Sequence, residues 1–413
     1  MRKQKKALIL GGVAPHIELI KELKKRGYYT ILADYLNNPP ARKYADVFFQ
    51  ISVLDKEAIL KLAQEENVDI VMCICVDHAN VTMTYVAEKL GLPMPYAYKT
   101  AIATTDKGEM KRIMCEVGVP TSSFVVVEEI SGIADINMRF PLIVKPVDNN
   151  GSKGVKTASN KEQLYRYVED AFNFSRKGEV IVEEFSCGKE IQVDCFSNKS
   201  KAHVVMIRQK LEMPRKEGLA LQSFGSILPA DLSDEVIEKI NNIAQSMVDA
   251  FRLEHTPFFF QAKVNNDDIE VLEVTPRIGG GLSYKMLKRQ TDFDVINTII
   301  DSYFGDVSNI EFKSKPQYML TNIIYATEGA FDRVSGIEKV INKGIIEDFD
   351  QFIDSGTIIR GAMDSRNRVG AYFIVADTRE ELIRKALIAE GEIDILDITG
   401  SSIACIQSIR GII

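Results

Sequence analysis

In the first hundred residues, short apolar runs typical of strands alternate with segments that have the hydrophobic spacing of amphipathic helices. Short apolar runs predict strands at 6–10, 29–34 and 69–76, and amphipathic segments predict helices at 16–26, 56–65 and 82–90. The run 69–76 is almost wholly apolar, as in a strand buried on both faces of a parallel sheet. This strand–helix order predicts a doubly wound, Rossmann-like unit over residues 1–100.

The pattern changes after residue 100. A helix is expected at 107–117, and then strands at 123–127, 142–145, 180–185, 190–197 and 202–209, with helices at 161–172 and 233–251. Two further strands, 258–264 and 269–274, should pair across a polar turn. We therefore expect an α/β domain over 101–305. The remainder, 306–413, alternates short strands with helices at 337–342 and 379–390, which predicts a small α+β subdomain.

Composition narrows the class of protein. The chain has 413 residues, of which 46% are hydrophobic and 26% charged, as in a soluble globular enzyme. A net charge of −7 argues against nucleic-acid binding, which needs a basic field. No apolar run approaches the ~18 residues that span a bilayer, so no membrane partner is expected. The six cysteines lack metal spacing and are expected to be reduced, which predicts a cytoplasmic protein.

Two common nucleotide-binding fingerprints are missing. Gly11-Gly12 follows the first strand, but the next residues do not complete G-x-G-x-x-G, which disfavours NAD binding. No GxxxxGK[ST] phosphate loop is present either, so a P-loop NTPase is excluded.

Polar residues alternate at the end of the strand 269–274. Glu273, Thr275 and Arg277 lie on one side of an extended segment that runs into three glycines. Oxygen ligands in this arrangement suit a hard cation that carries phosphates, such as Mg²⁺, and an arginine suits an anion. Taken alone, the segment fits a cation site and a polar strand end with a glycine-rich turn equally well.

Three other segments offer candidate chemistry. Lys145 ends an apolar strand before a small-residue loop at 148–155, which fits a phosphate-binding loop or a hairpin turn. Acids at 183, 184 and 190 flank a short connection, which fits either a nucleotide-binding segment or a solvated hairpin. Lys107 opens a helix, where an anionic partner would offset its unfavourable position. Asp77-His78, at the carboxyl end of the strand 69–76, fits a substrate contact or a plain turn.

In this order, the segments resemble the motifs of the ATP-grasp superfamily, especially its branch of carbamoyl-phosphate-synthetase-like enzymes and L-amino-acid (carboxylate–amine) ligases. The resemblance covers nearly the whole chain. It implies an α/β ATP-grasp fold with a Rossmann-like pre-ATP-grasp domain at 1–100. An ATP-grasp domain at 101–305 would clamp ATP between two lobes, and the α+β subdomain at 306–413 would complete the substrate site.

The resemblance also implies roles for individual residues in nucleotide binding. Lys107 and Lys145 would grip the α- and β-phosphates, and Glu190 would bind the ribose. The loop over the transferable phosphate would comprise Gly151, Ser152, Lys153 and Gly154, and the adenine hinge would comprise Glu183, Glu184, Phe185 and Ser186.

The same resemblance implies a metal site and a catalytic centre. Mg²⁺ or Mn²⁺ would be held by Gln261, Glu273 and Thr275, and Arg277 would meet the transferred phosphate, with Lys145 and Glu273 as the other catalytic residues. Thr275 stands where the family most often has asparagine, and Gln261 stands where many members have an acid.

The implied activity is an ADP-forming C–N ligase. ATP would phosphorylate a small carboxylate, and an amine would displace phosphate from the acyl-phosphate to form an amide or peptide bond. The alternatives are a ligase that uses bicarbonate or a nucleotide precursor, and an ATP-binding protein without catalysis. The identities of the carboxylate and the amine are left open, and so is a homo-oligomer.

Overall fold

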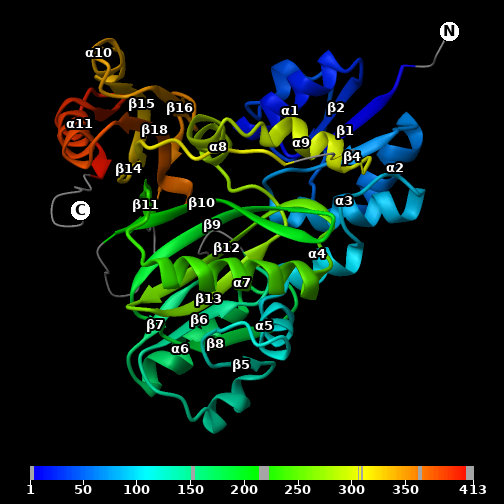
Figure 1. The fold of residues 1–413 in the computed structure, drawn as a ribbon, viewed down its shortest axis with the longest axis vertical. Coiled ribbons are helices and arrows are strands. Elements are labelled where there is room, and N and C mark those ends of the chain that lie inside the picture. Colours follow the sequence, from blue (N-terminus) through cyan, green and yellow to red (C-terminus); the bar gives the residue numbers. More distant parts are fainter. Residues whose placement is uncertain are drawn as a thin grey trace.

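The computed structural model describes residues 4–149, 154–213, 223–305, 307, 310–360 and 365–405. Within these residues the strands form four sheets. In Figure 1 the blue N-terminal unit and the orange-to-red C-terminal unit flank a central green sheet, and a teal lobe lies beyond that sheet. None of the helices in the described part of the chain has the length and apolar character needed to cross a membrane.

The N-terminal unit is the parallel α/β unit that the sequence predicts. Its sheet has the order β3-β2-β1-β4, with all three pairings parallel. The strands are β1 (Lys6–Leu10), β2 (Tyr29–Asp34), β3 (Val47–Gln50) and β4 (Ile70–Met72); the helices are α1 (Ala14–Lys25), α2 (Lys56–Glu66), α3 (Asp77–Leu90) and the 3₁₀ turn η1 (Arg42–Tyr44).

Strand β4 is shorter than the predicted strand 69–76, and α3 begins at Asp77 instead of Thr82. The segment after Met72 leaves the sheet because its backbone pairs elsewhere: the N–H of Ile278 donates to the carbonyl oxygen of Ile74 at 3.2 Å. Hydrophobicity alone does not distinguish a buried strand from a buried connection. The consequence is that Asp77 opens a helix beside the strand end that carries Arg277.

An antiparallel lobe follows, with strand order β5-β8-β6-β7. Its strands are β5 (Phe124–Val127), β6 (Leu142–Pro146), β7 (Lys156–Ala158) and β8 (Val180–Glu184), and α6 (Lys161–Phe172) and the 3₁₀ segment η2 (Ile130–Asp135) pack on it. Two helices lead into the lobe, α4 (Tyr98–Thr105), which the pattern did not predict, and α5 (Lys107–Glu116).

The central sheet follows the order β13-β12-β9-β10-β11-β14-β18-β16, with β20 paired to β14. Its members from residues 189–275 are β9 (Lys189–Asn198), β10 (Lys201–Glu212), β11 (Ser223–Leu228), β12 (His255–Asn265) and β13 (Asp268–Thr275). The predicted pairing of the last two strands is confirmed. The 18-residue helix α7 (Asp234–Phe251), capped by Ser233, packs its apolar side on this sheet, as Figure 1 shows.

Strands β8 and β9 lie in different sheets, so the segment between them is not the hairpin that the sequence left open. Gly188 makes the crossing, with φ +106°, and a Cβ there would come 2.2 Å from the carbonyl oxygen of Val264. Only glycine fits this close approach. The connection therefore joins the antiparallel lobe to the central sheet.

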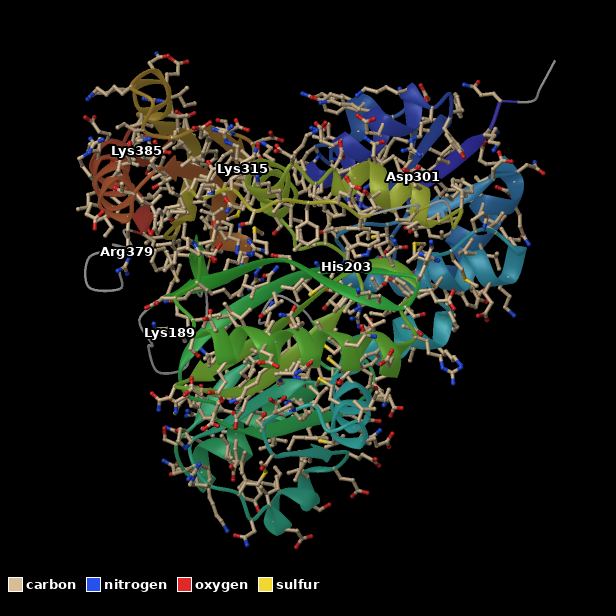
Figure 2. All side chains as sticks on the ribbon, viewed as in Figure 1. Lys189, His203, Asp301, Lys315, Arg379 and Lys385 are labelled. Atoms are coloured by element: carbon tan, nitrogen blue, oxygen red, sulfur yellow. The ribbon has the colours of Figure 1, made fainter. Side chains whose placement is uncertain are left out.

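The C-terminal strands continue the central sheet. They are β14 (Tyr318–Ala326), β16 (Asp348–Gln351), β18 (Arg368–Ala376) and β20 (Ala404–Cys405), while β15 (Gly329–Ser335), β17 (Ile358–Ile359) and β19 (Asp394–Asp397) form a three-stranded sheet. Their helices are α10 (Ile337–Asn342), α11 (Arg379–Glu392) and the 3₁₀ turn η3 (Ser365–Asn367). In Figure 2, Arg379 and Lys385 mark α11 at the outer end of this part.

Two helices follow β13, α8 (Ser283–Thr291) and α9 (Val295–Ser302), and α9 contacts the N-terminal unit. Arg26 at the end of α1 forms an ion pair with Asp301 at 2.5 Å and a hydrogen bond to the side chain of Asn297 at 2.7 Å. Figure 2 shows Asp301 beside the N-terminal unit. The N-terminal unit is thereby fixed to α9, the second helix after β13.

Candidate active site

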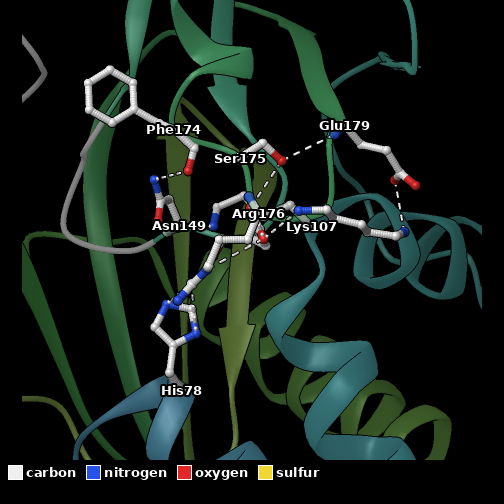
Figure 3. Close-up of polar contacts among 9 residues, drawn as sticks. His78, Lys107, Asn149, Phe174, Ser175, Arg176 and Glu179 are labelled. Atoms are coloured by element: carbon white, nitrogen blue, oxygen red, sulfur yellow. Dashed lines mark hydrogen bonds and ion pairs between the residues drawn. The ribbon is translucent and has the colours of Figure 1, made fainter. Parts of the chain in front are cut away.

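Lys107 lies in the first turn of α5, where Asp106 caps the helix by accepting from the N–H of Glu109 at 3.0 Å. The lysine is buried, and its Nζ donates to the carbonyl oxygen of Asn149 at 2.6 Å (Figure 3). Burial lowers the pKa of Lys107, and the negative charge of Glu273 partly offsets this. The buried Lys107 ammonium is thus held at Asn149, and it experiences the negative charge of Glu273 on β13, the strand that carries two of the predicted metal ligands.

Lys145, at the end of β6, forms a buried ion pair with Glu183 of β8 at 2.5 Å. Glu183 also meets Lys111 of α5 at 3.1 Å, and Lys111 donates to the hydroxyls of Thr121 and Ser122. Burial would raise the pKa of Glu183, but the charges of the two lysines lower it to about 2. The Glu183 carboxylate therefore holds two lysines in place, Lys145 and Lys111.

Sequence reasoning missed Lys111. Its signal was its spacing: it lies four residues after Lys107, and positions i and i+4 share one face of a helix. Both lysines of α5 consequently face the antiparallel lobe.

The hinge residues run from the end of β8 into the segment that follows it. The N–H of Glu184 donates to the carbonyl oxygen of Ser123 at 2.9 Å, and the N–H of Phe185 donates to that of Pro141 at 3.2 Å. Ser186 is buried, and its hydroxyl has no hydrogen-bond partner within the described residues. A buried, unpaired hydroxyl carries a desolvation cost that a ligand hydrogen bond would remove.

Glu190 of β9 is enclosed by lysines. Lys210 of β10 contacts Glu190 at 2.7 Å, and Lys263 of β12 contacts it at 3.5 Å and also pairs with Glu212. Burial opposes ionisation of Glu190, but these two lysines lower its pKa overall. Lys210 also donates to Oε1 of Gln261 at 2.9 Å. Sequence reasoning missed both lysines, because they meet these partners only through strand register.

The register of the central sheet places polar residues of four strands in one row. Glu273 on β13 pairs with Gln261 on β12, Gln261 with Gln192 on β9, and Gln192 with Arg208 on β10. The Glu273 carboxylate has no hydrogen bond or ion pair within the described residues, whereas Gln261 is bound by Lys210. Two of the three predicted metal ligands thus lie side by side, and Thr275 follows on the same strand.

Arg277 follows β13 and is held from three sides. Its guanidinium makes a two-pronged ion pair with Asp77 of α3, with one N–O distance of 2.7 Å, and donates to the carbonyl oxygen of Ile278 at 2.8 Å. It also lies over the ring of Phe259 at 5.0 Å from the ring centre. Burial opposes the charge of Arg277, but the Asp77 carboxylate raises the pKa of Arg277 overall. Burial likewise opposes the charge of Asp77, but the Arg277 guanidinium lowers the pKa of Asp77 overall. Asp77 is therefore a partner of the predicted catalytic arginine.

A second arginine lies at the other end of the polar row. Arg208 is buried, contacts Asp194 at 3.2 Å and donates to the hydroxyl of Ser283 at 2.6 Å. Gln192 donates to the same Asp194 at 2.8 Å. A Cβ at Gly279 would lie 2.5–2.9 Å from the tips of Ser283, Gln192 and Arg208, so the glycine-rich loop packs directly on this network.

Figure 3 shows a polar cluster between the N-terminal unit and the antiparallel lobe. His78 of α3 points at Arg176, with a nitrogen–nitrogen distance of 2.8 Å, and Arg176 donates to the carbonyl oxygen of Asp148 at 2.9 Å. Burial and the charge of Arg176 lower the pKa of His78 to about 4, so this histidine is neutral near pH 7. The cluster links α3 to the loop that leads toward the predicted phosphate lid.

The predicted phosphate loop is described only in part. Gly151, Ser152 and Lys153 lie outside the described residues. Gly154 is described and has φ +76°, a conformation that side chains other than glycine rarely adopt.

The sequence matches two family models. The model described as ATP-grasp domain matches residues 138–285, and the one described as L-amino acid ligase C-terminal domain 2 matches residues 322–396. Formate-dependent phosphoribosylglycinamide formyltransferase of Shewanella frigidimarina is 27% identical over 282 residues, which cover 66% of this chain and 68% of that protein. The enzyme of the same name from Bacillus subtilis is 25% identical over 67% of this chain and 72% of its own length. The match to its Mannheimia succiniciproducens counterpart spans 48% of that protein.

Solved structures resemble the chain over nearly its whole length. L-amino acid ligase from Bacillus licheniformis superposes with a TM-score of 0.80 at 20% identity, covering 96% of this chain and 100% of that one. Phosphoribosylglycinamide synthetase from Anaerococcus prevotii gives a TM-score of 0.74 at 19% identity, with the same coverage. These likenesses confirm the predicted α/β ATP-grasp fold. Residues 138–285 thus form an ATP-grasp domain, and residues 322–396 are similar to C-terminal domain 2 of the L-amino acid ligases.

Proposed function

We propose that this protein is an ATP-dependent ligase that joins a small carboxylate to an amine through an acyl-phosphate and releases ADP and phosphate. The observation that carries the proposal is the arrangement around the end of β13. Lys107, Lys145 and Arg277 come from α5, β6 and the segment after β13, and the N–H of Val274 on β13 donates to the sulfur of Met110 on α5 at 3.2 Å. The strand that carries Glu273 therefore packs against the helix that carries Lys107.

In this proposal the nucleotide lies between the antiparallel lobe and the central sheet. The adenine contacts the hinge Glu184–Ser186, where the Ser186 hydroxyl is buried and unpaired among the described residues. The ribose lies toward Glu190, and the phosphates lie along Lys145 and Lys107. Glu183 keeps the Lys145 ammonium oriented by its buried ion pair.

A divalent cation fits the residues at the end of β13. Glu273 offers a carboxylate without a protein cation in contact within the described residues, and Thr275 offers a hydroxyl two positions on. Hard oxygen donors of this kind suit Mg²⁺, which binds through one or two carboxylates together with phosphate oxygens. When bound there, Mg²⁺ would neutralise charge on the phosphates during transfer.

The chemistry needs cations and alignment, and no protein nucleophile. A carboxylate oxygen of the substrate attacks the γ-phosphorus of ATP while the bond to the β–γ bridging oxygen breaks, which gives acyl-phosphate and ADP. The amine nitrogen then attacks the acyl carbon, phosphate leaves, and the amine loses a proton. Arg277, fixed by Asp77 and by Phe259, lies where it can stabilise the transferred phosphoryl group.

An L-amino acid as the carboxylate substrate is supported by the match at residues 322–396 to a domain of L-amino acid ligases. The names of the relatives from Shewanella frigidimarina and Bacillus subtilis combine formate, a small carboxylate, with phosphoribosylglycinamide, which supports a small carboxylate as one substrate.

The test is release of ADP from ATP and Mg²⁺ across a panel of L-amino acid pairs, with each amino acid also supplied alone. We expect the rate to depend on a carboxylate and an amine together, and mass spectrometry should detect the amide product. Nucleotide binding with no turnover for any carboxylate–amine combination, bicarbonate and formate included, would contradict the proposal.

A further inference from the structure

Glu273 on β13 differs from the other acids around this strand in what its carboxylate contacts. Asp77 contacts Arg277, Asp194 contacts Arg208, and Glu183 contacts two lysines. Glu190 also contacts two lysines, Lys210 and Lys263. Within the described residues the Glu273 carboxylate alone of these acids has no cation in contact. The described residues also hold no group of three or more His, Cys, Asp or Glu arranged to bind a metal.

A second metal ion would need the side chain opposite Glu273 on β12, which is Gln261. Two-metal sites place their ions about 3.5–4 Å apart, so each ion needs ligands of its own besides a shared carboxylate. The amide of Gln261 brings no negative charge, and its oxygen already accepts a hydrogen bond from Lys210 at 2.9 Å.

Lys210 is fixed in this position. Its Nζ contacts Glu190 at 2.7 Å as well as Gln261, and its side chain is only 20% exposed. Mg²⁺ binds oxygen at about 2.0–2.1 Å, so an ion on the Gln261 oxygen would lie within about 5 Å of the Lys210 ammonium. Like charges at such a distance repel strongly in a poorly solvated site. The second metal position therefore does not fit the residues present.

We infer that this protein works with one divalent ion per chain, on Glu273, and that the Lys210 ammonium takes the place of a second ion beside Gln261. The inference rests on the proposed function, since it concerns the same ATP site. Lys210 is then a further residue of the nucleotide site, located between the predicted ribose acid and the metal.

Counting bound ions tests this directly. Mn²⁺ is titrated into the full-length protein with a non-hydrolysable ATP analogue, and free Mn²⁺ is measured by electron paramagnetic resonance. We expect one bound ion per chain in the ternary complex, with the ion that the bound analogue carries included in the count; a protein-free control gives the Mn²⁺ held by free analogue, which is subtracted. In Lys210→Met the count should rise toward two, because the competing ammonium is gone.

Lys263→Met is the matched control. It removes a lysine from the same acid cluster, but Lys263 bonds Glu190 and Glu212 and, within the described residues, not Gln261, so the count should stay at one. Two ions per chain in the wild type, or an unchanged count in a folded Lys210→Met variant, would overturn the inference while leaving the proposed function standing. If Lys210→Met does not fold, the wild-type count decides. Failure of the wild type to bind the nucleotide analogue at all would overturn both.

Discussion

The negative charge of Glu273 acts on the pKa of Lys107, yet the Glu273 carboxylate contacts no cation within the described residues. Its neighbours Glu183 and Glu190 are instead neutralised by lysines that the fold brings in from other elements. Among the described acids of the site, this difference separates Glu183 and Glu190, which orient lysines, from Glu273, whose carboxylate is available to a ligand. An ionised carboxylate in a partly buried site without a partner favours binding of a cation.

Glu273→Gln should reduce the rate of ADP release by about 10²–10³-fold, because the variant keeps the shape of the side chain but loses the charge that holds the metal. Binding of a fluorescent ATP analogue should be partly retained, since the lysines are untouched. Glu270→Gln, the same change earlier on β13, serves as the matched control and should leave turnover near the wild-type rate. Equal rates for wild type and Glu273→Gln would rule out the metal assignment.

Acidification should weaken the fold through Glu183. Its pKa in the folded protein, about 2, lies below its ordinary value of 4.5, so its stabilising effect is complete above about pH 4.5 and is lost as the pH falls toward 2. The loss amounts to about 3 kcal/mol in the free energy of unfolding. Urea unfolding between pH 6 and pH 3 should show about 2 kcal/mol of this loss, because the remainder falls between pH 3 and pH 2. In Glu183→Gln, which is less stable throughout, this part of the pH dependence should disappear; an unchanged profile would contradict the assignment.

At the scale of elements, the sequence predicted most strands and helices, because apolar periodicity is local. It placed β12 and β13 as a pair and Lys145 at a strand end before a glycine loop, and the structure agrees. It could not show that β8 and β9 belong to different sheets, or that Lys210 reaches Gln261. Those facts depend on pairing between strands distant in sequence, which a single sequence does not encode locally.

The loop between β13 and α8 owes its path to Gly279. Gly279→Ala would place a methyl group 2.5–2.9 Å from the tips of Ser283, Gln192 and Arg208, which are buried; Arg208 donates to Ser283, and Gln192 donates to Asp194. Overpacking of this kind costs about 1–3 kcal/mol and should displace Arg208, with a lower turnover rate. Gly280→Ala is the matched control, since a Cβ there meets no atom within 4 Å. Thermal unfolding and ADP release should separate the two variants; equal behaviour would show that the loop does not depend on this contact.

At the scale of the whole molecule, the N-terminal unit contributes directly to the candidate active site. Asp77 opens α3 and holds Arg277, 200 residues away in sequence, and His78 faces Arg176 of the antiparallel lobe. The family resemblance supplied the ATP-grasp fold and the order of the motifs, but no motif names the partner of Arg277. Shortening of β4, which frees residues 73–76 to approach Ile278, is what brings Asp77 to that arginine.

Asp77→Asn should act mainly on the chemical step. The variant leaves Arg277 charged and buried without its ion partner, so we expect kcat to fall by about 100-fold through loss of orientation, with little change in the KM for ATP. Stability should also decrease, by about 3–5 kcal/mol, because one partner of a buried pair is removed. Asp69→Asn, in the same unit but bonded to the backbone of Lys6, should leave kcat unchanged. A normal kcat in folded Asp77→Asn would show that Asp77 serves stability alone.

The central claim is that a substrate carboxylate attacks ATP and becomes an acyl-phosphate. Its most direct test is a turnover experiment with a carboxylate labelled with ¹⁸O on both oxygens, followed by mass spectrometry of the released phosphate. One ¹⁸O atom should appear in each phosphate released, because the attacking carboxylate oxygen leaves with the phosphoryl group. Release of ADP with unlabelled phosphate would contradict the account.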